Sequence, residues 1–163
     1  SYDNNLKAKE ALIADIEAFV ISEDVEANLN ALKDFQRRWA EIGFVPIKHK
    51  EDIQKRYRAA INKHFEQLNI EESKRNLLRF KSKIDGAHGN ARQENKLRNE
   101  RDKLFNRLRQ LENDIALWEN NIGFFARTKN AESMIQEVER KIKKAKEEIV
   151  LLEEKIKLID QLD

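Results

Sequence analysis

This chain has no cysteine, one proline and four glycines among its 163 residues. The missing cysteines exclude disulfide bonds and thiolate metal sites, and they are compatible with a reducing compartment. So few prolines and glycines leave long stretches without a helix breaker, which favours extended helices over a sheet protein rich in turns. No apolar run approaches the ~20 residues of a membrane-spanning helix, and nothing resembles a signal peptide. We therefore expect no membrane-spanning segment and no membrane partner.

The chain also lacks a strong excess of either charge. It has 32 Lys and Arg against 30 Asp and Glu, so no global field favours nucleic acid or a membrane surface. The distribution is uneven, because residues 1–32 hold 2 basic and 7 acidic side chains whereas residues 33–88 hold 14 basic and 8 acidic ones. The basic middle is the one electrostatic indication of a polyanionic partner. The alternative is a set of solvated helix faces beside an acidic first helix.

The apolar residues recur at the spacing of amphipathic helices. They predict three helices in the first part of the chain, over about residues 4–20, over 24–42 and from 48 onward. Gly43 is expected to end the second helix in the left-handed conformation. The third helix meets no glycine or proline before Gly86, and whether it is continuous to residue 85 stays open at this point.

Two longer helices are predicted after that, over about residues 91–121 and 131–162, with a tip at 123–130 between them. Their apolar residues step by alternating threes and fours, which is the heptad seam of a coiled coil. So short a connection requires the two helices to pair antiparallel. The seam residues are Leu97, Leu104, Leu108, Leu111, Ile115, Trp118 and Ile122 in the first helix, and Ile135, Val138, Ile142, Ala145, Ile149, Leu152, Ile156 and Ile159 in the second.

The position of the tip sets which residues of this hairpin face each other. A register centred in the middle of the tip places Leu97 opposite Ile156. Arg101 is the one charged seam residue, and it is predicted to reach Glu148 or Glu153 and to fix the register. Apolar residues off the seam at the open end require a further partner, for which the end of the third helix is the nearest candidate.

Two short matches indicate an internal repeat. Trp39-Ala-Glu-Ile-Gly-Phe44 ends the second predicted helix, Trp118-Glu-Asn-Asn-Ile-Gly-Phe124 ends the fourth, and Asn5-Leu6 is echoed by Asn76-Leu77. Together they suggest one helical unit whose second copy is elongated, with the same turn at both Ile-Gly-Phe sequences. Trp39 lies in the middle of an apolar stripe, so it is predicted to be a core residue and not a platform for stacking bases.

One segment of the chain resembles a known family. Leu32-Lys-Asp-Phe-Gln-Arg-Arg-Trp-Ala-Glu-Ile-Gly-Phe-Val-Pro46, followed by Ile53-Gln-Lys-Arg-Tyr-Arg-Ala-Ala60 and His64-Phe65, resembles the bacterial domain of unknown function 349. The hairpin sequence Trp-Glu-Asn-Asn-Ile-Gly-Phe-Phe resembles the terminal coiled coil of the Bacteroidetes versions. The resemblance implies a cytoplasmic bacterial helical protein, often with tandem copies of the domain. It implies no enzyme, since the family has no catalytic residues to carry over.

The residues themselves indicate no catalytic chemistry. The sequence has no Gly-rich phosphate loop and no nucleophile elbow. His49, His64 and His88 lie in different predicted elements without metal-ligand spacing, and they are expected at the surface or partly buried. Every carboxylate fits a solvent-facing position. We therefore expect no enzyme, no catalytic residue, no metal site and no cofactor.

Two surfaces are candidate binding sites. An apolar knob at the hairpin tip, made by Phe124, Phe125, Arg127 and Lys129, suits a protein partner. The alternative is that Phe124 packs over the hairpin end, which leaves Phe125 as the residue to test. A basic face suits the phosphates of RNA, for instance on a ribosome. It comprises Arg37, Arg38, Lys55, Arg56, Arg58 and Lys63.

These observations together predict an all-α protein. Residues 1–70 form a three-helix bundle-like unit, and residues 71–163 form a connecting helix and a long antiparallel coiled-coil hairpin. The expected role is a non-enzymatic interaction or scaffold module that binds a protein partner through the hairpin tip or a bundle face. The alternative is an RNA- or ribosome-associated protein that uses the basic segment 33–83. Off-seam apolar residues are also compatible with a homo-oligomer, and the start in mid-pattern at Ser1 suggests a fragment of a longer protein.

Overall fold

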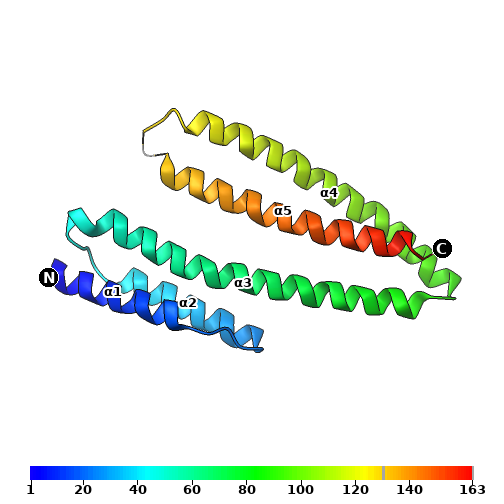
Figure 1. Ribbon diagram of the computed structural model, residues 1–163, viewed down its shortest axis with the longest axis horizontal. Coiled ribbons are helices and arrows are strands. Elements are labelled where there is room, and N and C mark those ends of the chain that lie inside the picture. Colours follow the sequence, from blue (N-terminus) through cyan, green and yellow to red (C-terminus); the bar gives the residue numbers. More distant parts are fainter. Residues whose placement is uncertain (130, 163) are drawn as a thin grey trace. The chain divides into compact units, whose positions relative to one another are not determined.

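The computed structural model describes residues 1–129 and 131–162, and within that part of the chain it contains helices and no strand (Figure 1). The predicted all-α class is therefore confirmed. The helices are α1 (Tyr2–Ala18), α2 (Val25–Glu41), α3 (Ile47–Ala87), α4 (Ala91–Phe125) and α5 (Glu132–Asp160). The chain divides into two compact units, Ser1–Glu72 and Ser73–Asp163, whereas the prediction divides it after residue 70.

Helix α3 is continuous over its 41 residues and contributes to both units. At 1.5 Å per residue it is roughly 60 Å long. Its length follows from its composition, because the first glycine in it is Gly86, one residue before its end. The helix ends at Ala87, and Gly89 then adopts the left-handed conformation with φ of 78°. Asn90 begins α4 as its N-cap, where its side chain accepts a hydrogen bond from the Gln93 amide at 3.1 Å.

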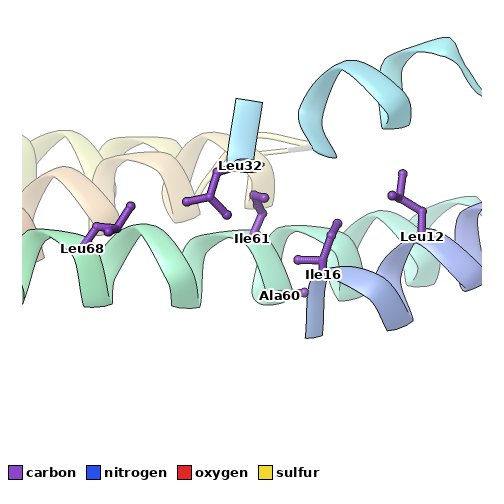
Figure 2. Close-up of a cluster of buried hydrophobic side chains, with 6 residues drawn as sticks. All are labelled: Leu12, Ile16, Leu32, Ala60, Ile61 and Leu68. Carbon is purple, nitrogen blue, oxygen red and sulfur yellow. The ribbon is translucent and has the colours of Figure 1, made fainter. Parts of the chain in front are cut away.

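The first unit buries one main core among α1, α2 and the first half of α3 (Figure 2). Its most buried members are Leu12, Ile16, Leu32, Ala60, Ile61 and Leu68. Aromatic rings close the edges of this core. The Trp39 indole packs against it and stacks on the Tyr57 ring at a centroid distance of 4.0 Å and an angle of 11°. Trp39 is therefore the core residue that its position in the apolar stripe predicts.

The connection between α1 and α2 is held by the buried side chain of Asn28, which is 2% exposed. Its Nδ2 donates to the Ser22 carbonyl oxygen at 2.8 Å, and its Oδ1 accepts from the Ser22 amide at 2.9 Å. The side-chain amide thus supplies the partners that the loop backbone would otherwise lack. Asp24 is the N-cap of α2 and accepts from the Ala27 amide at 3.0 Å.

Gly43 is not the left-handed residue that the sequence predicts. Helix α2 ends at Glu41 and is followed by Ile42 in an extended conformation, and Gly43 has no positive φ. Gly43 is required for a close approach instead, because a Cβ there would lie 2.9 Å from the Nδ2 of Asn5.

Two side-chain hydrogen bonds connect the ends of α1 with α3 and with the segment just before α3. Near the start of α1, Asn5 donates from Nδ2 to the Phe44 carbonyl oxygen at 2.7 Å, just before α3 begins. Near its end, the ring of His64 on α3 hydrogen bonds through Nε2 to the Ile16 carbonyl oxygen at 2.5 Å. These two contacts show that α1 and the first part of α3 run in the same direction.

In the second unit, α4 and α5 form an antiparallel hairpin whose helices pack along the predicted seam. Leu108, Leu111, Ile115, Ile142, Ala145 and Leu152 are buried in one cluster, and half-buried seam residues surround it. The end of α3 joins the open end of the hairpin, where Phe80 and Ile84 are buried with Leu97 and Ile159. The predicted third partner at the open end is thus confirmed. Two apolar residues off the seam, Phe105 and Val150, nevertheless stay 38% and 60% exposed.

The tip begins later than predicted, and the register shifts with it. Helix α4 does not end at residue 121 but continues through Gly123 to Phe125, because no proline or capping residue stops it. Residue 130 of the predicted tip lies outside the described residues. Leu97 shares its buried cluster with Ile159, and not with the predicted partner Ile156. Moving the tip about two residues toward the C-terminus accounts for that change.

The predicted partners of Arg101 are wrong for the same reason. Its guanidinium pairs with Asp160, with Nε at 2.6 Å from Oδ1 and Nη2 at 3.2 Å from Oδ2. Glu148 pairs instead with Arg107, at 3.1 Å. The hydrogen bonds that Arg101 donates to Asp160, and next the negative charge of that carboxylate, raise the pKa of Arg101. Arg101 therefore pairs at the open end of the hairpin, about two to three turns of α5 beyond the predicted partners Glu153 and Glu148.

Candidate functional site

The hairpin tip is a short turn closed by its own backbone and one hydroxyl group. The Ala126 amide continues the helix by donating to the Ile122 carbonyl oxygen at 3.0 Å. Thr128 then bonds twice to the Phe125 carbonyl oxygen, from its amide at 3.0 Å and from Oγ1 at 2.9 Å. These bonds cap α4 and define where the tip residues lie.

The two phenylalanines of the tip have opposite environments. Phe125 is half-buried, whereas Phe124 is 72% exposed, and their rings meet edge to face with centroids 6.3 Å apart. The helical spacing explains this, since Phe125 follows Trp118 by seven residues and Ile122 by three and so continues the seam. The alternative in which Phe124 packs over the hairpin end is therefore wrong, since Phe124 is the exposed ring and Phe125 the half-buried one.

Further exposed groups surround Phe124. Arg127 and Lys129 are exposed, and neither has an ion pair within residues 1–129 and 131–162. Leu117, seven residues before Phe124 and therefore on the same face of α4, is 58% exposed. Met134, near the start of α5, is 49% exposed. Sequence reasoning missed Leu117, although its place off the seam, directly before Trp118, is a signal that could have found it.

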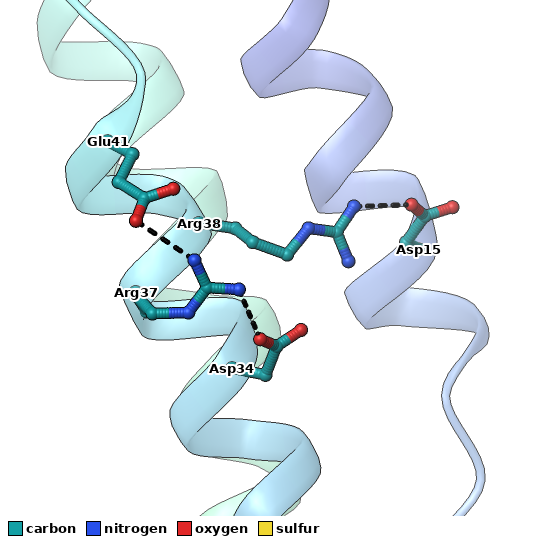
Figure 3. Close-up of polar contacts among 5 residues, drawn as sticks. All are labelled: Asp15, Asp34, Arg37, Arg38 and Glu41. Atoms are coloured by element: carbon teal, nitrogen blue, oxygen red, sulfur yellow. Dashed lines mark hydrogen bonds and ion pairs between the residues drawn. The ribbon is translucent and has the colours of Figure 1, made fainter.

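The predicted basic face is partly neutralised by acidic residues of its own unit (Figure 3). Arg37 bonds to Asp34 at 2.6 Å and to Glu41 at 2.9 Å, one turn away on either side of α2. Arg38 reaches across to Asp15 on α1 at 3.4 Å. The hydrogen bonds of Asp34 and Glu41 raise the pKa of Arg37. Two of the six predicted phosphate contacts thus already have carboxylate partners, which weakens their attraction for a polyanion.

The remaining basic residues lie on α3 and differ in their surroundings. Lys55, Arg56 and Lys63 are exposed, while Arg58 is half-buried and interacts with another group of the chain. Arg56 and Lys63 stand seven residues apart, so they share one face of the helix. The structure therefore brings together three of the six predicted residues as an exposed basic strip on α3.

The three histidines do not converge. His64 is 6% exposed, His49 is half-buried and His88 is exposed. His64 is thus more buried than predicted, because its ring caps the carbonyl end of α1 and packs edge to face on Phe19 at 5.3 Å. Within residues 1–129 and 131–162, no group of three His, Asp or Glu side chains is placed to hold a metal ion. The described helices include none that is long and apolar enough to cross a membrane.

The second unit also carries a groove of about 730 Å³ where the end of α3 meets the start of α4. Its polar lining includes Lys83, Lys96, Lys103 and Glu100. Glu100 is held by Lys83 at 2.9 Å, so the one carboxylate of this lining already has a cationic partner. Leu97 and Ala87 form the apolar floor, and both belong to the buried cluster at the open end of the hairpin.

One comparison with known proteins gives a match. The model of a family described as Domain of Unknown Function (DUF349) matches residues 1–48. These residues cover α1, α2 and the turn through Gly43 and Pro46, and they overlap the segment on which the resemblance rests. No curated protein and no solved structure matches the chain.

Proposed function

We propose that this chain, whose residues 1–48 match the DUF349 family model, is a non-enzymatic interaction module of the bacterial cytoplasm. In this proposal the α4–α5 hairpin is a coiled-coil spacer that presents its tip to a protein partner. In the same proposal the hairpin corresponds to the terminal coiled coil of the Bacteroidetes versions of the domain, which its sequence Trp-Glu-Asn-Asn-Ile-Gly-Phe-Phe resembles. The absence of cysteine, compatible with a reducing compartment, supports the proposed location.

One observation carries the proposal: Phe124 is 72% exposed at the end of a helical hairpin. Leu97, at the open end, precedes it by 27 residues, so the ring lies roughly 40 Å along the hairpin from there. Burying this exposed aromatic ring in an apolar pocket of a partner would remove its apolar surface from water, which favours binding. Exposed Arg127 and Lys129 beside it add donors for a partner of opposite charge.

The proposal is tested with a photo-crosslinking phenylalanine analogue at position 124 of the full chain. A matched control carries the same analogue at Val150, which is also exposed, at 60%, but lies along α5 away from the tip. We expect a discrete protein adduct from position 124 in bacterial lysate, unchanged by nuclease and absent from position 150. Equal labelling from both positions, or none from position 124, would refute the tip as the contact.

A second candidate function is RNA binding by the basic strip on α3. The exposed side chains of Lys55, Arg56 and Lys63 favour it, since none of the three has an ion pair within the described part of the chain. Each phosphate contact reduces the affinity further as salt rises, so retention on RNA should fall steeply between low and physiological ionic strength. Loss of that retention in Lys55→Gln/Arg56→Gln would support this function. Absence of retention at low salt in the unaltered chain would exclude it.

A further inference from the structure

The face of α4 opposite its seam carries a second heptad pattern, which we name the outer stripe. Its residues step by alternating fours and threes, so they follow one line along the helix. They are Asn106, Gln110, Asn113, Leu117, Asn120 and Phe124, and all six are exposed. Asn113, for example, lies two residues from both Leu111 and Ile115, which are buried against α5. Two residues correspond to about 200° around a helix, so the stripe points away from α5.

The outer stripe contains no charged residue, although charged residues make up 38% of the chain. On α5 the equivalent positions, midway between seam residues, are Arg140, Glu147 and Glu154. Asparagine is a weaker helix former than Lys, Glu or Arg, so it is a poor choice for an exposed helix position. The three asparagines make no side-chain hydrogen bond within residues 1–129 and 131–162 that would offset this. Depletion of charge is typical of the centre of a protein interface.

The outer stripe is complementary to a second copy of itself. A side-chain amide both donates and accepts hydrogen bonds, so one asparagine can pair with another. In a parallel pair of α4 helices related by a two-fold axis, each stripe residue faces its own copy. The asparagines would then form amide layers, and Leu117 and Phe124 would form apolar ones. Asparagine at a seam position specifies register and the number of strands, at a cost in stability.

Two charged residues beside the stripe select the parallel arrangement. Arg109 directly precedes Gln110, and Asp114 directly follows Asn113, so the two flank the stripe on opposite sides. In a parallel coiled coil such residues, five positions apart, meet across the interface. Arg109 of each copy would therefore meet Asp114 of the other, whereas an antiparallel pair would keep them apart. Neither has an ion pair in the described part of the chain, and the Arg109 guanidinium lies over the Phe105 ring at 5.3 Å.

We propose that a second copy of this chain binds along the outer stripe, as a parallel two-stranded coiled coil from Asn106 to Phe124. Lys103 occupies the next seam position toward the open end. It would face its own copy there, and repulsion between the like charges ends the contact. This inference rests on the proposed function, since it names a second copy as a partner of the exposed Phe124 ring. A short seam rich in amides gives a weak association.

The main experiment exchanges the flanking charges of the full chain and measures association by sedimentation equilibrium. The parent chain should dimerise with a dissociation constant below about 1 mM. Arg109→Asp or Asp114→Arg puts like charges at both crossing pairs, so either variant alone should dimerise about tenfold more weakly. An equimolar mixture of the two variants has opposite charges at both pairs and should recover the affinity of the parent. A mixture as weak as its components overturns the parallel pairing, and a parent that stays monomeric overturns the dimer.

Engineered thiols locate the contact, because the chain has no cysteine of its own. Asn113→Cys on the stripe is compared with Glu112→Cys, at the neighbouring exposed position off the stripe. Disulfide-linked dimers should form at least about tenfold faster from Asn113→Cys, because the seam holds its two thiols together. Adding Leu117→Lys should remove this advantage and leave the unfolding temperature of the dilute protein unchanged, since Leu117 is 58% exposed. Equal rates from the two cysteines, or an advantage that survives Leu117→Lys, overturn the site.

Photo-crosslinking from position 124 separates this inference from the proposed function. An adduct with a different protein, from a chain that stays monomeric, would overturn the second copy and support the tip contact. Disulfide dimers through position 113, without any adduct from position 124 in lysate, would support the second copy and refute the lysate partner.

Discussion

The ring of His64 makes two separable contributions to the first unit, and two substitutions measure them. Its Nε2 must carry the proton, because the Ile16 carbonyl oxygen it meets at 2.5 Å can act as an acceptor only. The same ring packs edge to face on Phe19 at a centroid distance of 5.3 Å. His64→Phe keeps an aromatic ring of similar size and removes the hydrogen bond, whereas His64→Ala removes both.

The structure sets the expected magnitudes. The Ile16 carbonyl oxygen also accepts from the Phe19 amide at 3.2 Å, so His64→Phe does not leave it without a partner and should cost about 1 kcal/mol. His64 is 6% exposed, so His64→Ala opens a cavity and should cost about 2–4 kcal/mol. For a unit of 72 residues, Ser1–Glu72, 1 kcal/mol corresponds to a melting temperature about 4–8 °C lower.

The assay follows Trp39 fluorescence during urea unfolding of chains that carry Trp118→Phe, so that the first unit is observed by itself. The unfolding free energies should rank the parent above His64→Phe and His64→Phe above His64→Ala. If His64→Phe were as stable as the parent, the hydrogen bond to α1 would contribute nothing and the reasoning would fail. If His64→Ala were no worse than His64→Phe, the ring packing would be the wrong explanation.

Three further perturbations are expected to give distinct results. Gly43→Ala brings a Cβ to 2.9 Å from the Asn5 side chain, so it should destabilise the parent protein by about 0.5–1.5 kcal/mol. In a chain that already carries Asn5→Ala, the same substitution should have no such effect. Equal costs in both backgrounds would contradict the close approach. Phe124→Ser should leave the melting temperature unchanged, while Leu111→Ala, at a site 3% exposed, should cost about 2–5 kcal/mol by calorimetry; a large loss from Phe124→Ser would show that the ring is structural. Burial lowers the folded-state pKa of Lys9 below 10.5. Between that lowered value and pH 10.5 the unfolded chain therefore binds more protons than the folded chain, so the stability of the protein should rise with pH relative to that of Lys9→Met. Parallel pH profiles of the two proteins in urea unfolding would rule this out.

The helices and the seam could be predicted from the sequence because they depend on local spacing. Apolar residues at threes and fours identify the helix faces without knowledge of the partner, and the seam from Leu104 to Trp118 packs as that spacing requires. The stretch between Pro46 and Gly86 contains no glycine or proline, which is likewise compatible with the single helix α3. These features repeat over many residues, so one misjudged position changes little.

The register and the site could not be predicted with the same accuracy, since each depends on one or two residues. The last residue of α4 decides whether Phe124 or Phe125 lies on the seam. No proline follows that end of the helix to mark it in the sequence. The need for glycine at position 43 depends on the close approach of Asn5, which is 38 positions away in the chain. Lys9 looked like any surface lysine, although its spacing from Leu6 and Ile13 already placed it on the buried face of α1.

The side chain of Asn28 has a consequence for the chemical ageing of the protein. Its amide nitrogen and oxygen serve the Ser22 carbonyl oxygen and the Ser22 amide at the same time. Deamidation to aspartate changes the size of the residue very little, yet it replaces the donor with a second acceptor and sets two oxygens against each other at a site 2% exposed. The same product arises from a single-base change in an asparagine codon. One of the smallest alterations available to this chain would therefore open the loop that joins its first two helices.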